Sequence, residues 1–64
     1  MRYIITQEQG VTIIHVLEQN ICFAYDESEN YDLFRVALDT KGIDAFVDLL
    51  IQDPNTAYLT FING

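Results

Sequence analysis

Residues 3 to 25, YIITQEQGVTIIHVLEQNICFAY, decide the fold that we predict for this chain. Three stretches in this segment, residues 3–6, 11–17 and 21–25, are rich in the β-branched and aromatic residues that strands favour. Short polar connectors separate them, and the first connector, residues 7–10, ends in glycine. Such connectors between strand-like runs predict hairpins. We therefore expect a three-stranded antiparallel meander.

The alternation of side chains along these strands predicts two different faces. If the two residues that flank each connector pair with each other, Thr6 pairs with Val11 and Glu18 pairs with Ile21. One face then carries the bulkier side chains and is the expected core: Tyr3, Ile5, Ile14, Val16, Ile21, Phe23 and Tyr25.

The other face is less bulky but still apolar. It gathers four apolar residues around His15: Ile4, Val11, Ile13 and Leu17. One helix cannot cover both faces of such a sheet, and contiguous exposed apolar patches mark interfaces. This face is therefore a candidate homodimer or partner contact, unless residues 30–39 cover it.

Residues 43–51 carry the clearest helical pattern of the chain. Their apolar residues recur at i, i+3, i+4, i+7 and i+8: Ile43, Phe46, Val47, Leu50 and Ile51. Asp39 or Thr40 could cap the start, and Pro54 cannot continue a helix. We expect one main helix at about residues 41–52, packed against the sheet.

Two further segments complete the predicted fold. Residues 30–39 fit a helix through Leu33, Phe34 and Ala37, and a strand through the alternation of Phe34, Val36 and Leu38; we favour a fourth strand. Residues 56–62 alternate as a C-terminal strand. The expectation is a small α+β domain that spans residues 1–64 as a single unit.

Charge is the property with the most functional content. The chain has three basic and ten acidic residues, which gives a formal net charge of −7. Residues 1–25 contribute −1 and residues 26–64 contribute −6. Because a strongly anionic protein repels nucleic acid and acidic membranes, we expect neither to bind directly. The expected partner is a basic protein surface.

The acids concentrate in a tyrosine-flanked run and on the predicted helix. The candidate partner-binding residues are Tyr25, Asp26, Glu27, Glu29, Tyr31, Asp32, Asp44 and Asp48. Regularly spaced carboxylates could imitate phosphates and block the basic site of a nucleic-acid-handling enzyme. In size and charge the chain resembles small acidic inhibitors that bacteriophages make against host nucleases, glycosylases and CRISPR effectors. The alternative is a structural or regulatory homodimer whose acids serve solubility.

The sequence offers little for catalysis or metal binding. Structural zinc sites need about four Cys or His ligands, and the chain has one of each. Residues 26–32 lack the glycine and glutamate positions of an EF-hand calcium loop. His15, Cys22 and Asp26 share a predicted sheet face and are the only catalytic candidates, with a buried structural cysteine as the preferred interpretation. We expect a non-enzymatic protein without cofactor or metal.

Location is predicted from two further features. A single cysteine cannot form an intramolecular disulfide, and the first residues show neither a signal peptide nor a membrane span. The expectation is a cytoplasmic protein.

Overall fold

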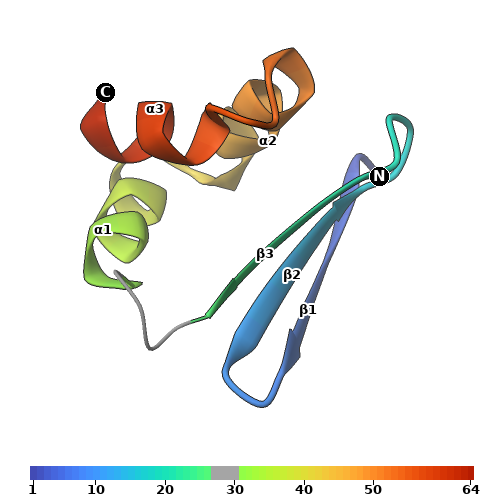
Figure 1. Ribbon diagram of the computed structural model, residues 1–64, viewed down its shortest axis with the longest axis horizontal. Helices are drawn as coiled ribbons and strands as arrows, with labels where there is room; N and C mark the ends of the chain where they lie inside the picture. Colours follow the sequence, from blue (N-terminus) through green and yellow to red (C-terminus); the bar gives the residue numbers. More distant parts are fainter. Residues whose placement is uncertain (27–30) are drawn as a thin grey trace. The chain divides into compact units, whose positions relative to one another are not determined.

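The computed structural model describes residues 1–26 and 31–64, in which three strands precede three helices (Figure 1). Strands β1 (Tyr3–Glu8), β2 (Val11–Val16) and β3 (Ile21–Asp26) are followed by helices α1 (Tyr31–Lys41), α2 (Ile43–Gln52) and α3 (Ala57–Asn63). The predicted α+β class is confirmed. The chain forms two compact units, a sheet unit of residues 1–31 and a helical unit of residues 32–64. The expectation of a single domain stays a prediction.

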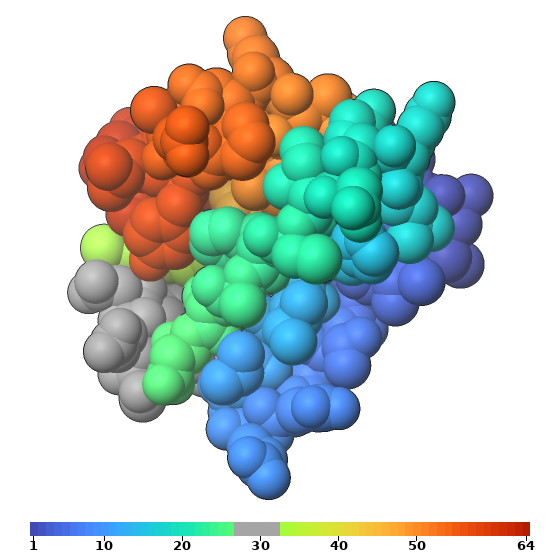
Figure 2. All heavy atoms as spheres, turned by 45° about the vertical axis from the view of Figure 1, so that its right-hand side comes forward, coloured from blue at the N-terminus to red at the C-terminus, as the bar shows by residue number. Residues whose placement is uncertain are grey.

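The sheet unit is the predicted antiparallel meander, with strand order β1, β2, β3. Its strands lie side by side as adjoining bands that run from blue to green (Figure 2). Gln9 and Gly10 form the first turn, with φ values of 50° and 80°. Two successive positive φ values are typical of a type I′ hairpin turn, whose twist matches that of the strands. The second connector, residues 17–20, includes Asn20 at φ 55°.

Both predicted pairing registers are wrong by two residues. Glu8 pairs with Val11, because the first connector has two residues rather than four. Val16 pairs with Ile21, because the second has four residues rather than two. A shift of two residues leaves each side chain on its predicted face, since the strand period is two. The assignment of residues to faces is therefore unaffected.

Burial agrees with the predicted core face along the central strand. Thr12, Ile14 and Val16 are at most 3% exposed and alternate with half-buried residues on the other side of β2. Gln7 Nε2 donates to Thr12 Oγ1 at 3.5 Å, across a directly paired position. On the edge strands, Ile5 is 46% exposed, and four residues of the core face are half-buried: Tyr3, Ile21, Phe23 and Tyr25.

The helical unit encloses a cluster of aromatic rings. Phe46 from α2 lies 4.9 Å, between ring centroids, from both Phe34 of α1 and Phe61 of α3. Phe34 and Phe61 are 5.7 Å apart, and Tyr58 stacks at 5.5 Å from Phe34. Edge-to-face and tilted pairs at these distances add to the stabilisation from burial alone.

The predicted fourth strand at residues 30–39 is wrong, because residues 31–41 form α1. Phe34 and Ala37 are buried, whereas Val36 is 62% exposed. A strand would have placed Phe34, Val36 and Leu38 on one face. The helical alternative, which groups Phe34 with Ala37, describes the burial correctly.

The predicted C-terminal strand is also wrong, because residues 57–63 form α3. Ala57 and Phe61, which are four residues apart, are 1% exposed, while Leu59 is 59% exposed. The burial period is therefore that of a helix rather than of a strand.

The predicted main helix corresponds to α2, but it begins two residues later than expected. Gly42 separates α1 from α2. Its φ of 90° and ψ of 156° define a backbone conformation that is available almost only to glycine. Neither Asp39 nor Thr40 caps α2, since both belong to α1 and Gly42 occupies the N-cap position. At the other end, Asp53 precedes Pro54 and stops the helix as predicted.

One lysine links the first and last helices. Lys41 Nζ donates to the Phe61 carbonyl oxygen at 2.6 Å and lies 5.3 Å from the centroid of the Phe61 ring. Because a cation at a helix C-terminus also interacts favourably with the helix dipole, Lys41 stabilises the end of α3. In the described part of the chain, no helix is both long and apolar enough to span a bilayer.

Candidate functional site

Asp44 and Asp48 lie on the exposed side of α2. The opposite side of α2 carries its buried residues, Phe46, Val47 and Leu50. Both aspartates are exposed and stand one helical turn apart, about 6 Å along the helix axis. Asp44 lies in the first turn, where the helix dipole stabilises a negative charge. The predicted pair therefore shares one surface of a rigid element.

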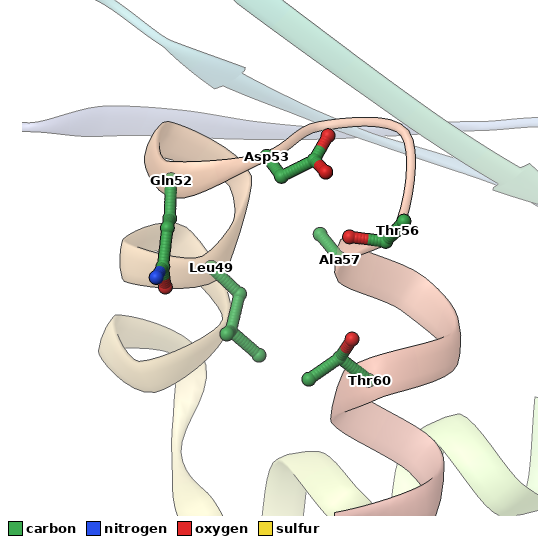
Figure 3. Close-up of a pocket in the computed structure, with 6 residues that line it drawn as sticks. All are labelled: Leu49, Gln52, Asp53, Thr56, Ala57 and Thr60. Carbon is green, nitrogen blue, oxygen red and sulfur yellow. The ribbon is translucent and has the colours of Figure 1, made fainter.

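A hollow of about 240 Å³ lies between α2 and α3 (Figure 3). Leu49 and Gln52 reach it from α2, and Thr60 reaches it from α3. The remaining lining comes from the connector between the helices and the start of α3: Asp53, Thr56 and Ala57. The wall therefore combines apolar carbon with carboxylate, amide and hydroxyl groups.

Hydrogen bonds hold the connector that closes one end of the hollow. The Asp53 carbonyl accepts from the backbone N–H groups of Thr56 at 3.3 Å and Ala57 at 3.1 Å. Asp53 Oδ1 accepts from the Asn55 N–H at 3.1 Å, an arrangement in which the side chain mimics a backbone turn. The Asp53 carboxylate thus has a defined position beside the hollow.

The sequence between Ile43 and Gly64 has three acids and no basic residue. Asp44, Asp48 and Asp53 therefore give α2, its connector and α3 a formal charge of −3. We call the surface formed by Asp44, Asp48, Asp53 and the hollow the α2 acidic surface. The nearest cation in the sequence is Lys41, which precedes α2 and donates to the Phe61 carbonyl.

A second hollow in the helical unit has a different character. It measures about 290 Å³ and is lined by Leu33 and Val36 of α1, by Ile62 of α3 and by Lys41, among others. Its charged group is a cation, so it is unsuited to a basic partner.

The predicted acidic run is only partly described. Tyr25 is half-buried, with its ring centroid 6.0 Å from that of Phe23, and Asp26 is exposed at the end of β3. Glu27 and Glu29 lie outside the described residues. Tyr31 and Asp32 begin α1, and their side chains lie outside the described part. The role of this run as a partner contact stays a prediction.

The second predicted surface is present on one side of the sheet. Ile4 is 46% exposed and pairs with His15, while Val11 and Ile13 are half-buried. Leu17 lies outside β2, in the following connector, and is 37% exposed.

His15 pairs directly with Cys22, not with Ala24 as the predicted register implied. Its Nε2 lies 3.0 Å from Asn20 Oδ1. Cys22 is exposed, so the expectation of a buried cysteine is wrong. Asp26 pairs with Val11, two pairing positions beyond Ala24. The three catalytic candidates therefore share a face but form no compact group.

His, Cys, Asp and Glu are the side chains that could bind a metal ion in the residues that the structure describes. Among them, no three or more His, Cys, Asp or Glu side chains are grouped so that they could hold a metal ion. The expectation that the chain is not an enzyme stays a prediction.

Sequence reasoning missed the six residues that line the hollow of the α2 acidic surface: Leu49, Gln52, Asp53, Thr56, Ala57 and Thr60. The absence of basic residues after Lys41 was visible in the sequence and could have drawn attention to Asp53. Thr56 and Thr60 could not be placed beside α2 while residues 56–62 were assigned to a strand.

Comparison with known proteins identifies no relative. The chain matches no family model, and neither the curated proteins nor the solved structures show significant similarity to it.

Proposed function

We propose that the chain is a non-enzymatic binding protein that docks on a basic protein surface, such as the nucleic-acid-binding groove of an enzyme, and thereby inhibits it. The observation that supports this most is the α2 acidic surface, because residues 43–64 contribute three carboxylates and no Lys or Arg. Attraction between such a surface and a basic groove accelerates encounter and weakens with salt.

The spacing on α2 supports recognition of a surface that normally binds phosphates. Asp44 and Asp48 project from one face of a helix whose opposite face is buried. Their backbone positions therefore keep a constant separation of about 6 Å along the axis. Basic groups that are arranged along a phosphate backbone can pair with both carboxylates. This pairing is the sense in which the protein would imitate nucleic acid.

The hollow beside Asp53 offers a place for an anchoring side chain. At about 240 Å³ it is smaller than most small-molecule sites, which have volumes of roughly 300–1,000 Å³. An arginine suits it, because the aliphatic part can cover Leu49 and Ala57 while the guanidinium faces Asp53 and Gln52. Arginine is also enriched among the residues that dominate interface energy.

The experiment compares two variants with equal changes in charge. Asp44→Asn with Asp48→Asn removes two charges from the α2 acidic surface, whereas Glu18→Gln with Asp39→Asn removes two exposed charges elsewhere. The tagged proteins are used to isolate a partner from the native host, and the affinity of the purified partner is then measured at low and high salt. We expect at least a tenfold loss for the first variant and little change for the second.

Competition with DNA or RNA distinguishes binding at the partner's nucleic-acid site from binding elsewhere on the partner. If the protein occupies a nucleic-acid site, added DNA or RNA should displace it and it should inhibit the partner's nucleic-acid binding. A variant with Asp26→Asn, Glu27→Gln, Glu29→Gln and Asp32→Asn tests the acidic run separately. Equal affinity of all variants, or a partner that binds nucleic acid and this protein at once, would exclude the proposal.

A further inference from the structure

We propose that two copies of the chain associate face to face through the open side of the sheet, with their strands antiparallel. The open side is the face opposite the buried residues Thr12, Ile14 and Val16. The pairing places its strand residues in three rows: Ile4, His15 and Cys22; Thr6, Ile13 and Ala24; Glu8, Val11 and Asp26.

The two middle rows of the open side carry four apolar residues beside Thr6 and His15. Ile4 is 46% exposed, Cys22 and Ala24 are exposed, and Ile13 is half-buried between them. These residues occupy two adjacent rows on three neighbouring strands, so they form one contiguous patch. Exposed apolar patches of this kind favour association, because association removes their area from water.

The charges on the open side identify a second copy as the occupant. The ladder continues beyond the Ile4 row, since the Arg2 carbonyl accepts from the Leu17 N–H at 2.9 Å, and the alternation of strand residues puts Arg2 on the same face as Ile4. Glu8 and Asp26 lie in the row at the opposite end. The face therefore has a positive end, an apolar middle and a negative end.

Only one of the two simple two-fold arrangements matches these charges. An axis perpendicular to the strands, between the two sheets, places Arg2 of each copy over Glu8 of the other. An axis parallel to the strands, along β2, instead places β1 of one copy over β3 of the other and brings Glu8 to Asp26, and like charges in contact are destabilising. The antiparallel arrangement therefore gives two intermolecular Arg2–Glu8 pairs around an apolar centre.

The sheet segment itself carries little of the net charge. Residues 1–26 contain Arg2 and three acids, a formal charge of −2, so most of the net −7 lies elsewhere in the chain. The sheet face is small, about 20 Å along six-residue strands and three strands wide, or roughly 300 Å². Because stable interfaces bury about 800 Å² per partner, we expect a weak, concentration-dependent dimer.

Analytical ultracentrifugation at protein concentrations up to about 1 mM measures the affinity of the dimer. We expect this affinity to be lower than that of complexes with standard-size interfaces. Reversal of one charge, as Arg2→Glu or as Glu8→Arg, should weaken dimerisation at least tenfold. The two reversals together should restore it to within about threefold, because the ion pairs re-form with opposite polarity. Glu18→Arg, which makes the same charge change as Glu8→Arg in the β2–β3 connector, should have no such effect.

Cys22 gives an independent test of geometry. In the antiparallel arrangement it lies across from Ala24 of the other copy, so the two Cys22 Cα atoms are about 12 Å apart for sheets separated by about 10 Å. A short bis-maleimide should therefore link wild-type dimers through Cys22. Ile4→Asp should abolish both the linkage and the sedimentation shift, while circular dichroism shows an intact fold.

Each result decides the question. A monomer at the highest concentration, a dimer that tolerates Ile4→Asp, or a double charge reversal that fails to restore association would overturn the proposal. The Asp44→Asn, Asp48→Asn variant should dimerise normally, so failure of the dimer and failure of the proposed function can be told apart.

Discussion

The sheet unit and the helical unit bury their residues in different ways. In the helical unit, side chains from all three helices meet, and Phe34, Phe46 and Phe61 are each at most 1% exposed. In the sheet unit, only the central strand has buried residues, and neither β1 nor β3 has one. The helices are thus organised by the convergence of a few rings, whereas the sheet is organised by backbone pairing and the geometry of its turns.

The largest expected effect is that of Phe46→Ala. Phe46 is 0% exposed and contacts both other phenylalanine rings of the cluster. Its truncation should lower the free energy of unfolding by about 3–5 kcal/mol, a large fraction of the stability that is usual for a chain this small. Urea denaturation followed by far-UV circular dichroism measures the loss. Leu59→Ala, at a residue that is 59% exposed, is the control and should have little effect.

Ile14→Ala tests the sheet unit in the same way. Ile14 is 1% exposed, so we expect a loss of about 2–5 kcal/mol. Its cross-strand neighbour Ile5 is 46% exposed, and Ile5→Ala should give less than half of that loss in the same denaturation experiment. Equal losses at the two positions would contradict the view that burial is confined to the central strand.

Gly42→Ala tests the backbone between α1 and α2. No atom lies within 4 Å of the added Cβ, so the expected loss of about 1–3 kcal/mol comes from the positive φ alone. Thermal unfolding should show a clearly lowered midpoint. Gly10→Asn, in the hairpin turn, is the comparison in the other unit and should be milder, because asparagine tolerates left-handed turn positions. A midpoint unchanged by Gly42→Ala would contradict the assigned conformation.

Lys41→Met tests the link between α1 and α3. The substitution keeps a long apolar side chain but removes the hydrogen bond to the Phe61 carbonyl and the contact of the cation with the ring. The expected loss is about 1 kcal/mol by denaturant titration. Arg35→Met removes an exposed ion pair with Asp39 at 3.7 Å and should lower stability by only about 0.3 kcal/mol. The reverse order would show that Lys41 makes no specific contribution.

Gln9→Asn should produce the smallest effect, a gain in stability. Gln9 has φ 50° at the first central position of the hairpin turn, where asparagine followed by glycine is preferred. We expect an increase of a few tenths of a kcal/mol, visible as a slightly higher midpoint of thermal unfolding. A decrease would argue against the type I′ geometry.

The sequence was sufficient to predict the strands because residues 3–6, 11–17 and 21–25 are rich in β-branched and aromatic residues and are separated by short polar connectors. It was insufficient for the two short helices. In α1, Phe34 and Leu38 fit either period, and the choice depended on whether Ala37 or Val36 is buried together with Phe34. Within α3, the alternating Ala57, Leu59 and Phe61 concealed the pair of buried residues four apart.

The candidate site could also be predicted from the sequence only in part. Asp44 and Asp48 were predicted correctly as neighbours on one helix, because their spacing is a local property. The hollow between α2 and α3 joins residues 49–53 to residues 56–60, and its prediction required the correct identity of α3. Leu17 was counted in a strand because the length of the second connector could not be fixed from the residue types Gln19 and Asn20.

The two-residue period of the strands has a consequence for how this protein can change over evolution. Insertion or deletion of two residues within a strand or turn moves the pairing but keeps Ile14 and Val16 on the buried side. Loss of a single residue would expose them and turn His15 inward. The lengths of the hairpin segments can therefore drift among descendants by even numbers, while odd changes should be rare unless a bulge absorbs them.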